Sequence, residues 1–553
     1  MRGLVLLLVG VGACASGPRP FALRDPMWRD TDLDPRPAAC RPDPEKPGHQ
    51  LCRPGEYVSS FAWDGADNII FRPLTEFFAV DPAGEAVNVN SLDEVPDSSW
   101  FTNRIGRAPM SVEEMKQGSC APEDVLDPDA PDGTWLIDSG KPNGANPGFR
   151  IRLPDGRKYM LKSDLPIQPE RTTGAAAIAG RLYHAAGWFV SCDTPVYLKP
   201  SILKLKPGLK VTDNQGMSRP FDQAALDALL ARASKRGDRV RFMASRWLPG
   251  RTIGPFTYAG TRSDDPADVI RHEDRRDLRG ARLLAAWTSH FDSREQNSMS
   301  TWLSADPKDP DASPGHVRHY YIDLGDCFGS AWTDEIWRRI GHAYYFDIGY
   351  LVADFLTLGI ITRPWDRARR EPDSIFGYYT ARDFDPEKWR GGYPNPAFDN
   401  MSEHDGAWAA RIIARFTDEH LRAAVDVGDF TDPAQSAYLV EQLIGRRDLI
   451  LRRYFALLSP VTDLAVDGGK LCGVDLARRT RVFPAELFHY RARVAGGAAL
   501  PVEARDDGVV CVSLPRASGY LVVELENGQA QRPLRAHLYD QGPSGHRLVG
   551  IER

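Results

Sequence analysis

Two clusters of polar residues in the middle of the chain combine side chains that can accept a proton, carry positive charge and bind a metal ion. The first runs from His290 to Asn297 with the pattern His-x-Asp-x-Arg-x-x-Asn, and the second is Asp323-Leu324-Gly325. Carboxylate and amide oxygens are the ligands that magnesium prefers. A carboxylate base, a cation and metal-binding oxygens are together what phosphoryl transfer requires of a protein. We therefore expect these residues to share one site.

The elements that must position the two clusters can be predicted from the sequence. A helix over about 274–289, which carries three leucines and Trp287, leads directly into His290. Two strands separated by an acidic, proline-containing loop, about residues 305–314, precede Asp323. The clusters are therefore predicted at the ends of regular elements.

A glycine-containing hairpin lies upstream of both clusters. Strands are predicted over 134–138, 149–153 and 158–162, and the third ends in Lys162. The loop between the first two contains Gly140, Gly144 and Gly148, whose backbone amides could cradle phosphate. A helix is then predicted from Glu170, with Gly187 placed to close it.

This order of motifs resembles the protein-kinase-like superfamily, in particular its HipA-like and spore-coat-kinase branches. The pattern from His290 to Asn297 is similar to the kinase catalytic loop, and Asp323-Leu324-Gly325 is similar to its D-F-G metal motif. The resemblance covers roughly residues 134–458. It implies a two-lobed α+β domain that binds ATP with magnesium or manganese and phosphorylates a hydroxyl group.

The resemblance also implies a role for each matching residue. His290, Asp292 and Arg294 are implied as catalytic residues, with Asp292 deprotonating the acceptor and Arg294 contacting the γ-phosphate. Lys162 would bind the α- and β-phosphates. The residues implied as ligands of the metal ion are Asn297 and Asp323.

The loop and helix depart from the family pattern in two places. The glycines recur every four residues, whereas the kinase loop has the pattern G-x-G-x-x-G. The helix position expected to hold a glutamate that pairs with Lys162 is occupied by Ala176 and Ala177. Glu170, at the start of that helix, is the candidate to replace this glutamate.

The N-terminus has the features of an exported bacterial lipoprotein. An uncharged run over residues 3–13 is too short to span a bilayer as a helix and is typical of a secretory signal. It ends in Val-Gly-Ala before Cys14, which resembles a lipobox, and Ala15 at the next position implies sorting to the outer membrane. The alternative is an ordinary cleaved signal with an incidental cysteine.

Export allows the remaining seven cysteines to form disulfides. We expect pairs between Cys40 and Cys52 and between Cys472 and Cys511. Because seven is odd, at least one thiol stays free or pairs outside the chain. Cys327 is the candidate, since it follows the motif at Asp323 by four residues.

Composition and patterning divide the chain into unequal parts. With 42% apolar and 26% charged residues it is a globular protein, and a net charge of −6 without any basic run makes nucleic acid an unexpected partner. The parts that we expect are a signal (1–14), a proline-rich tether (15–57), a strand and loop region (58–133), a kinase-like domain (134–460) and a C-terminal β domain (461–553).

Two functions remain open from the sequence. The first is ATP-dependent phosphotransfer to an unidentified protein or envelope acceptor, by a protein that its lipid anchor holds on a membrane. The second is a pseudokinase that binds nucleotide or acts as a scaffold without catalysis, because ATP is scarce outside the cytoplasm.

Overall fold

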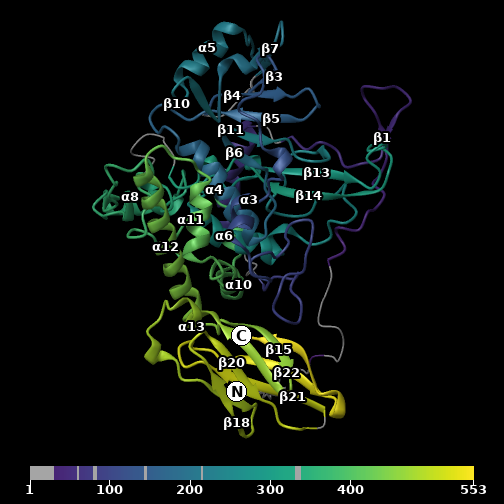
Figure 1. Cartoon of the computed structure of the whole chain (residues 1–553). Coiled ribbons are helices and arrows are strands. Elements are labelled where there is room, and N and C mark those ends of the chain that lie inside the picture. The colour runs from purple at the N-terminus through teal and green to yellow at the C-terminus, as the bar shows by residue number, and fades with distance from the viewer. Residues whose placement is uncertain are drawn as a thin grey trace, which may run out of the picture.

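The computed structural model of the chain describes residues 21, 30–58, 61–78, 84–141, 146–212, 216–329, 338–517 and 519–553. The described chain is a mixed α+β protein with several sheets, as the sequence predicts. Figure 1 shows a sheet at the top, helices in the middle and a separate group of strands at the bottom. None of the described helices is both long and apolar enough to cross a bilayer.

The upper sheet has seven strands and contains the predicted hairpin. Its strands are β3 (Trp135–Gly140), β4 (Gly148–Arg152), β5 (Lys158–Lys162), β6 (Asp193–Leu198), β7 (Leu203–Leu205), β10 (Lys235–Arg236) and β11 (Arg239–Arg246). They lie in the order β10-β11-β5-β4-β3-β7, β6 also pairs with β11, and only the pairing of β3 with β7 is parallel. The strands predicted at 134–162 are thereby confirmed.

A long helix, α4 (Arg171–Ala186), connects this sheet to the body of the protein. Its alanines favour a helix, and their small side chains allow close packing. Every residue from Arg171 to Tyr183 is buried. It ends at Gly187 with φ of 132°, where a Cβ atom would lie 2.2 Å from the ring of Phe101. The predicted helix from Glu170 to Gly187 is thus confirmed.

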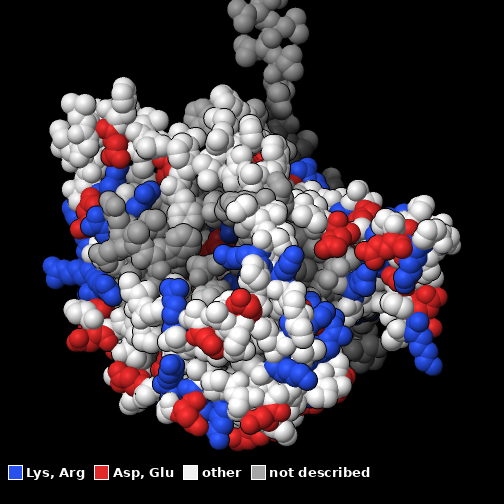
Figure 2. Space-filling model, turned by 90° about the horizontal axis from the view of Figure 1, so that it is seen from above, with Lys and Arg blue, Asp and Glu red and all other residues white. Residues whose placement is uncertain are grey.

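Smaller elements extend the upper sheet. They are η3 (Pro200–Ile202), the pair β8 (Lys210–Thr212) and β9 (Ser218–Pro220), and α5 (Gln223–Arg232). Figure 2, which views the molecule from above, shows Lys and Arg interspersed with Asp and Glu over this face.

The body is built from helices around a core rich in tryptophan. The predicted helix that leads to His290 is α6 (Arg276–Thr288). It packs on two later helices, α10 (Glu403–Ile413) and α12 (Pro433–Phe455), with Trp287 and Trp408 fully buried. The helices after it are α8 (Ile348–Thr357), α9 (Pro396–Asp399), α10 (Glu403–Ile413), α11 (Asp418–Asp426) and α12 (Pro433–Phe455). Short turns of 3-10 helix are η4 (His272–Asp274), η5 (Glu295–Asn297), η6 (Leu324–Asp326) and η7 (Pro364–Asp366).

A small sheet beside α6 carries the two polar clusters. It consists of β12 (Arg251–Thr252), β13 (Ser298–Ser304) and β14 (Gly315–Tyr321). β13 and β14 pair along their whole length, from Ser298 opposite Tyr321 to Ser304 opposite Gly315. The predicted loop at 305–314 closes this hairpin, since the backbone N–H of Ala305 donates to the carbonyl of Pro314.

The last part of the chain forms two antiparallel sheets around their own core. Their strands are β15 (Val461–Asp467), β16 (Lys470–Asp475), β17 (Arg491–Val494), β18 (Ala499–Leu500), β19 (Val502–Ala504), β20 (Val509–Ser513), β21 (Gly519–Glu526), β22 (Leu534–Asp540) and β23 (His546–Glu552). Also present are α13 (Leu476–Thr480), η8 (Ala485–Leu487) and η9 (Gly542–Ser544). The first strand begins at Val461, where the sequence places the boundary.

The expected tether over 15–57 is wrong for residues 30–57, which pack on the body. Asp30 and Asp32 are buried, and Asp30 forms an ion pair of 2.8 Å with Arg275 of the segment before α6. The short strands β1 (Arg41–Pro42) and β2 (Gln50–Leu51) pair with each other. Arg53 bonds to Asp311 at 2.7 Å. The contacts of Asp30 and Arg53 with the body join residues more than 200 positions apart, so local composition could not reveal them.

The expected strands between 58 and 133 are also wrong. Residues 61–78 form α1 (Phe61–Ala66), η1 (Asp67–Phe71) and α2 (Arg72–Phe78), and the other described elements before β3 are α3 (Val112–Gln117) and η2 (Pro122–Asp124). Arg72 forms an ion pair of 2.5 Å with Glu295, which lies between the two ends of the first polar cluster. The β-branched residues of this segment favour strand, yet it forms helices, and one of them is joined to the body by the ion pair between Arg72 and Glu295.

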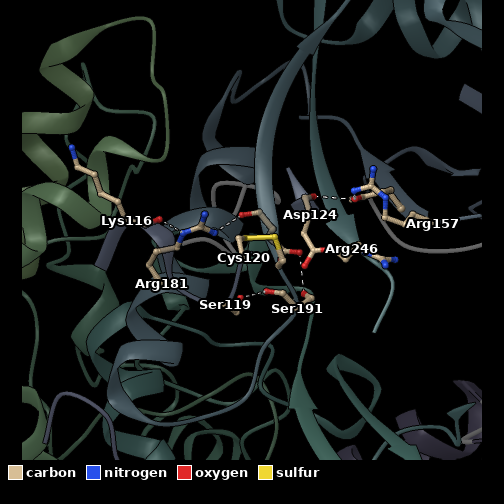
Figure 3. The surroundings of a disulfide bond; sticks show 11 residues. Lys116, Ser119, Cys120, Asp124, Arg157, Arg181, Ser191 and Arg246 are labelled. Carbon is tan, nitrogen blue, oxygen red and sulfur yellow. Dashed lines mark hydrogen bonds and ion pairs between the residues drawn. A yellow bond between two sulfur atoms is a disulfide. The ribbon is translucent and has the colours of Figure 1, made fainter. Parts of the chain in front are cut away.

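Three disulfides form within the described chain. Cys40–Cys52 and Cys472–Cys511 confirm the two expected pairs, and Cys327 is a free, buried thiol as expected. Cys120–Cys192 was not expected. It joins the segment before β3 to the start of β6, beside Arg181 and Ser191 (Figure 3).

Candidate active site

Lys162 and Asp323 meet at the junction between the upper sheet and the body. Lys162 ends β5, and its Nζ lies 2.6 Å from Oδ1 of Asp323, which follows β14 by two residues. Burial alone would raise the pKa of Asp323, but the ammonium groups of Lys162 and Lys141 lower it to about 2. Asp323 is therefore a carboxylate near neutral pH.

The loop that carries Asp323 is held by α4. Arg171, the first residue of α4, donates to the carbonyls of Gly325 and Cys327 at 3.0 Å each. A Cβ atom on Gly325 would lie 2.7 Å from Cγ2 of Thr172, so this glycine permits the close approach of loop and helix. The backbone N–H of Phe328 then donates to the carbonyl of Thr288 at the end of α6.

Asp292 is surrounded by the other polar residues of its own cluster. Nδ2 of Asn297 donates to Oδ2 of Asp292 at 2.8 Å, and Nε of Arg294 lies 3.1 Å from Oδ1. The guanidinium of Arg294 also lies 5.3 Å from the ring centroid of Tyr393. These contacts fix the carboxylate of Asp292 in one orientation.

The small sheet brings the two clusters together. Asn297 directly precedes β13, and the backbone N–H of Ile322 donates to its carbonyl at 3.1 Å, one residue before Asp323. Since Nδ2 of Asn297 is bound to Asp292, Oδ1 is the atom of this amide suited to a cation. The pair of Asp292 and Asn297 and the pair of Lys162 and Asp323 thus lie at the same end of the β13–β14 hairpin.

His290 is fully buried, so it does not face an acceptor. Its Nδ1 lies 3.0 Å from the hydroxyl of Tyr183 in α4, and Nε2 has no hydrogen-bond partner among the described residues. Burial lowers the pKa of His290 to about 4, although Asp323 opposes the shift. The buried position of His290 therefore does not support the predicted catalytic role.

Two of the three glycines lie where a side chain would collide with neighbouring atoms. A Cβ atom on Gly140 would lie 2.3 Å from Val211, and one on Gly148 would lie 2.2 Å from the carbonyl of Leu161. Gly144 lies outside the described residues. The phosphate-binding role predicted for Gly140 and Gly148 is thus not what requires glycine at these positions.

Glu170 does not replace the missing glutamate, and this prediction is wrong. Its carboxylate accepts hydrogen bonds from the hydroxyl of Tyr197 at 2.8 Å and from the backbone N–H of Thr431 at 2.7 Å. It is the N-cap residue of α4, with a left-handed φ of 65° and no side-chain bond to the helix N-terminus. The carboxylate bound to Lys162 is Asp323 instead.

Two further charged groups lie near this ion pair. Burial and the charge of Lys162 lower the pKa of Lys141 to about 8, and Asp323 and Asp326 oppose the shift. Asp193, the first residue of β6, is buried, and burial raises its pKa although Lys162 opposes this. Lys141 follows Gly140 directly and could have been found from the sequence, whereas Asp193 has no such signal.

A cavity of about 260 Å³ lies beside the Asp292 loop. Phe291, Tyr344, Tyr345 and the glycines 391–392 are among its lining residues. The rings of Phe291 and Tyr345 meet edge to face, with centroids 6.2 Å apart. Asp292 is not among the lining residues, but Phe291, the residue before it, is.

Comparison with protein-family models, with curated proteins and with solved structures gave no match.

Proposed function

We propose that the chain is a kinase-like envelope lipoprotein that transfers phosphate from ATP to a hydroxyl group. The observation that carries the proposal is the ion pair between Lys162 and Asp323, with Asn297 held beside it. A lysine at the end of a strand, a carboxylate and an amide in one place are the groups that bind a metal nucleotide.

The arrangement of elements supports a two-lobed kinase-like domain. The sheet of β3–β7, β10 and β11 with α4 corresponds to the smaller lobe, and α6 with α9–α12 corresponds to the larger one. The polar clusters lie between them, on the hairpin of β13 and β14. Figure 1 shows this junction below β5 and β11.

The side chains fit ATP with magnesium or manganese. Lys162 and Lys141 are cations suited to phosphate oxygens, and Asp323 with Oδ1 of Asn297 would hold the metal ion. The bound nucleotide supplies the phosphoryl group that is transferred. Asp292 orients the acceptor hydroxyl and takes its proton, while Arg294 lies within reach of the same carboxylate and steadies it.

The proposal also includes where the protein is held and where the acceptor binds. A lipid at Cys14, which lies outside the described residues, would hold the protein on the outer membrane. The cavity beside Phe291 is the place where a protein or envelope acceptor would present its hydroxyl to Asp292.

Transfer of label from γ-labelled ATP tests the proposal. The full chain with magnesium should release labelled phosphate or label itself or an added envelope extract. Asp292→Asn should reduce this rate by about 100-fold or more, whereas Asp306→Asn, in the exposed loop between β13 and β14, should leave it unchanged. Absence of turnover in the unmodified chain would contradict catalysis.

A pseudokinase is the second candidate, and one observation favours it. The described helix α4 contains no acidic residue that could pair with Lys162, and Glu170 is bound to Tyr197 and Thr431. In a catalytic kinase the lysine and the helix glutamate must be in place together. Binding of ATP without any transfer of label would select this candidate.

A further inference from the structure

Large apolar side chains are exposed on α8 and on the segments that directly precede and follow it. We call this surface the apolar ridge, and it consists of Phe346, Leu351, Val352, Phe355, Leu356, Leu358, Ile360 and Ile361. Phe355, Leu358 and Ile360 are each more than 80% exposed. No residue of α8 is buried, and Figure 1 shows the helix at the outer edge of the body. Contiguous exposed apolar surface of this kind marks a contact with a partner or a membrane.

The ridge is held in place by polar contacts at its base. Asp347 caps the N-terminus of α8 and forms an ion pair of 2.7 Å with Arg390. Arg363 donates to the carbonyl of Tyr350 at 3.0 Å and forms an ion pair with Asp354, the charged residue within α8. The apolar side chains are therefore presented to solvent by a structured base.

Basic residues lie directly after the ridge. The stretch from Asp354 through Arg370 contains four arginines and two aspartates, and Glu371 and Asp373 follow it. Both aspartates of the stretch bond to Arg363. The guanidinium groups of Arg367 and Arg369 are on exposed residues. An apolar surface bordered by arginines is the pattern of an element that lies in the interface of an anionic bilayer.

We propose that the apolar ridge docks on an anionic lipid surface, with its apolar side chains among the acyl chains and Arg367 and Arg369 at the phosphates. The proposal concerns attachment and stands whether or not the site at Lys162 transfers phosphate. The arginines are its electrostatic part, and they favour lipid over an apolar partner protein.

The N-terminal segment would hold the folded protein near a membrane if Cys14 carries a lipid. Phe21 is fixed on the C-terminal sheet, because its backbone N–H meets the hydroxyl of Tyr520 and its carbonyl accepts a bond from Tyr539. Cys14 precedes Phe21 by only seven positions, a span of at most about 25 Å. A lipid at Cys14 would therefore keep the folded protein close to the bilayer surface, and the ridge would add a second point of attachment.

Vesicle co-sedimentation tests the proposal. The full chain carrying Cys14→Ser, which has no acylation site, is mixed with phosphatidylcholine vesicles that contain or lack phosphatidylglycerol. We expect Phe355→Ser combined with Leu358→Ser to weaken binding to the anionic vesicles at least about tenfold. Arg367→Gln with Arg369→Gln should weaken it at least about fivefold, and only when phosphatidylglycerol is present.

The matched control is Leu487→Ser, an exposed leucine of η8 in the C-terminal part. It should bind as the parent chain does, and because all proteins share residues 1–13, differences between them report on the ridge. Equal binding by the ridge variant and the control would overturn the proposal. A dimer in light scattering that the ridge variant converts to a monomer, with vesicle binding unchanged, would assign the ridge to a second copy instead.

The salt dependence of vesicle binding tests the proposal on the parent chain alone, so its result does not depend on whether the ridge variants fold. The parent chain should lose at least about tenfold in affinity for anionic vesicles when salt rises from about 50 to 500 mM, because arginine–phosphate attraction is screened. Affinity independent of salt and of phosphatidylglycerol would overturn the proposal.

Discussion

Nζ of Lys162 lies 2.6 Å from Oδ1 of Asp323 and so joins the end of β5 to the loop that follows β14. The two residues are 161 positions apart; Lys162 belongs to the seven-stranded sheet, and Asp323 lies two residues after the last strand of the three-stranded sheet. Because each group stabilises the charged form of the other, the pair holds a cation and a carboxylate at the junction of sheet and body. The proposed nucleotide site depends on this contact.

Replacement of Lys162 tests its role toward nucleotide. Lys162→Met removes the cation nearest to Asp323, so affinity for ATP with magnesium, measured by calorimetry, should fall by about tenfold or more. Lys158→Met, at the other end of β5, is the matched control and should keep the affinity of the unmodified chain. Equal losses in both variants would assign the effect to the strand as a whole.

Replacement of Glu170 distinguishes its observed contacts from the kinase-like pairing. Glu170→Gln weakens the bonds to Tyr197 and Thr431, so the free energy of unfolding in urea should fall by about 1 kcal/mol. Nucleotide affinity should stay within about twofold, because Lys162 is bound to Asp323. A loss of affinity as large as that of Lys162→Met would restore Glu170 to the site.

The buried His290 makes stability depend on pH. Its pKa is about 4 in the folded chain and about 6.5 when unfolded, so the unfolded state takes up a proton first as pH falls. Stability should therefore decrease from pH 6.5 to 4, with His290 contributing about 3 kcal/mol. His290→Phe should flatten this part of the curve of unfolding free energy against pH.

The comparison of the two proteins isolates His290 from other groups. Burial raises the pKa of Asp32 and of Asp265 to about 6, so these two groups increase stability as pH falls from 6.5 to 4. The unmodified chain and His290→Phe share this effect, so it cancels in the difference between their curves. Parallel curves for the unmodified chain and His290→Phe would show that His290 is not buried in its neutral form.

The unexpected disulfide should contribute more to stability than the expected one near the N-terminus. Cys120–Cys192 closes a separation of 72 residues and Cys40–Cys52 one of 12. A longer loop restricts the unfolded chain more, so we expect losses of about 4 and about 3 kcal/mol when each pair is replaced by alanine. Unfolding in urea measures both, and a larger loss for Cys40–Cys52 would contradict the entropic explanation.

The sequence predicts those features whose pattern is local. The strands around Lys162, the helix α4 and the hairpin before Asp323 follow from alternation, helical spacing and turn residues. The order of these elements along the chain also indicates that Lys162 and Asp323 could lie close together. Cys40 and Cys52 could be paired because little chain separates them.

Features decided by distant contacts could not be predicted in this way. Residues 30–57 have the composition of a tether, yet Asp30 is fixed by Arg275. The helices at 61–78 contain isoleucines that favour strand, and Arg72 is bound to Glu295. Asp193 joins the site only because β6 pairs with β11. In each case the partner lies far along the chain.

The most direct test of the central claim is a thermal-unfolding measurement of the full chain with and without ATP and magnesium. A ligand that binds only the folded state raises the unfolding temperature. We predict a rise for the unmodified chain and for Lys158→Met, and none for Asp323→Asn. No rise in the unmodified chain, or the same rise in Asp323→Asn, would contradict a nucleotide site at Lys162 and Asp323.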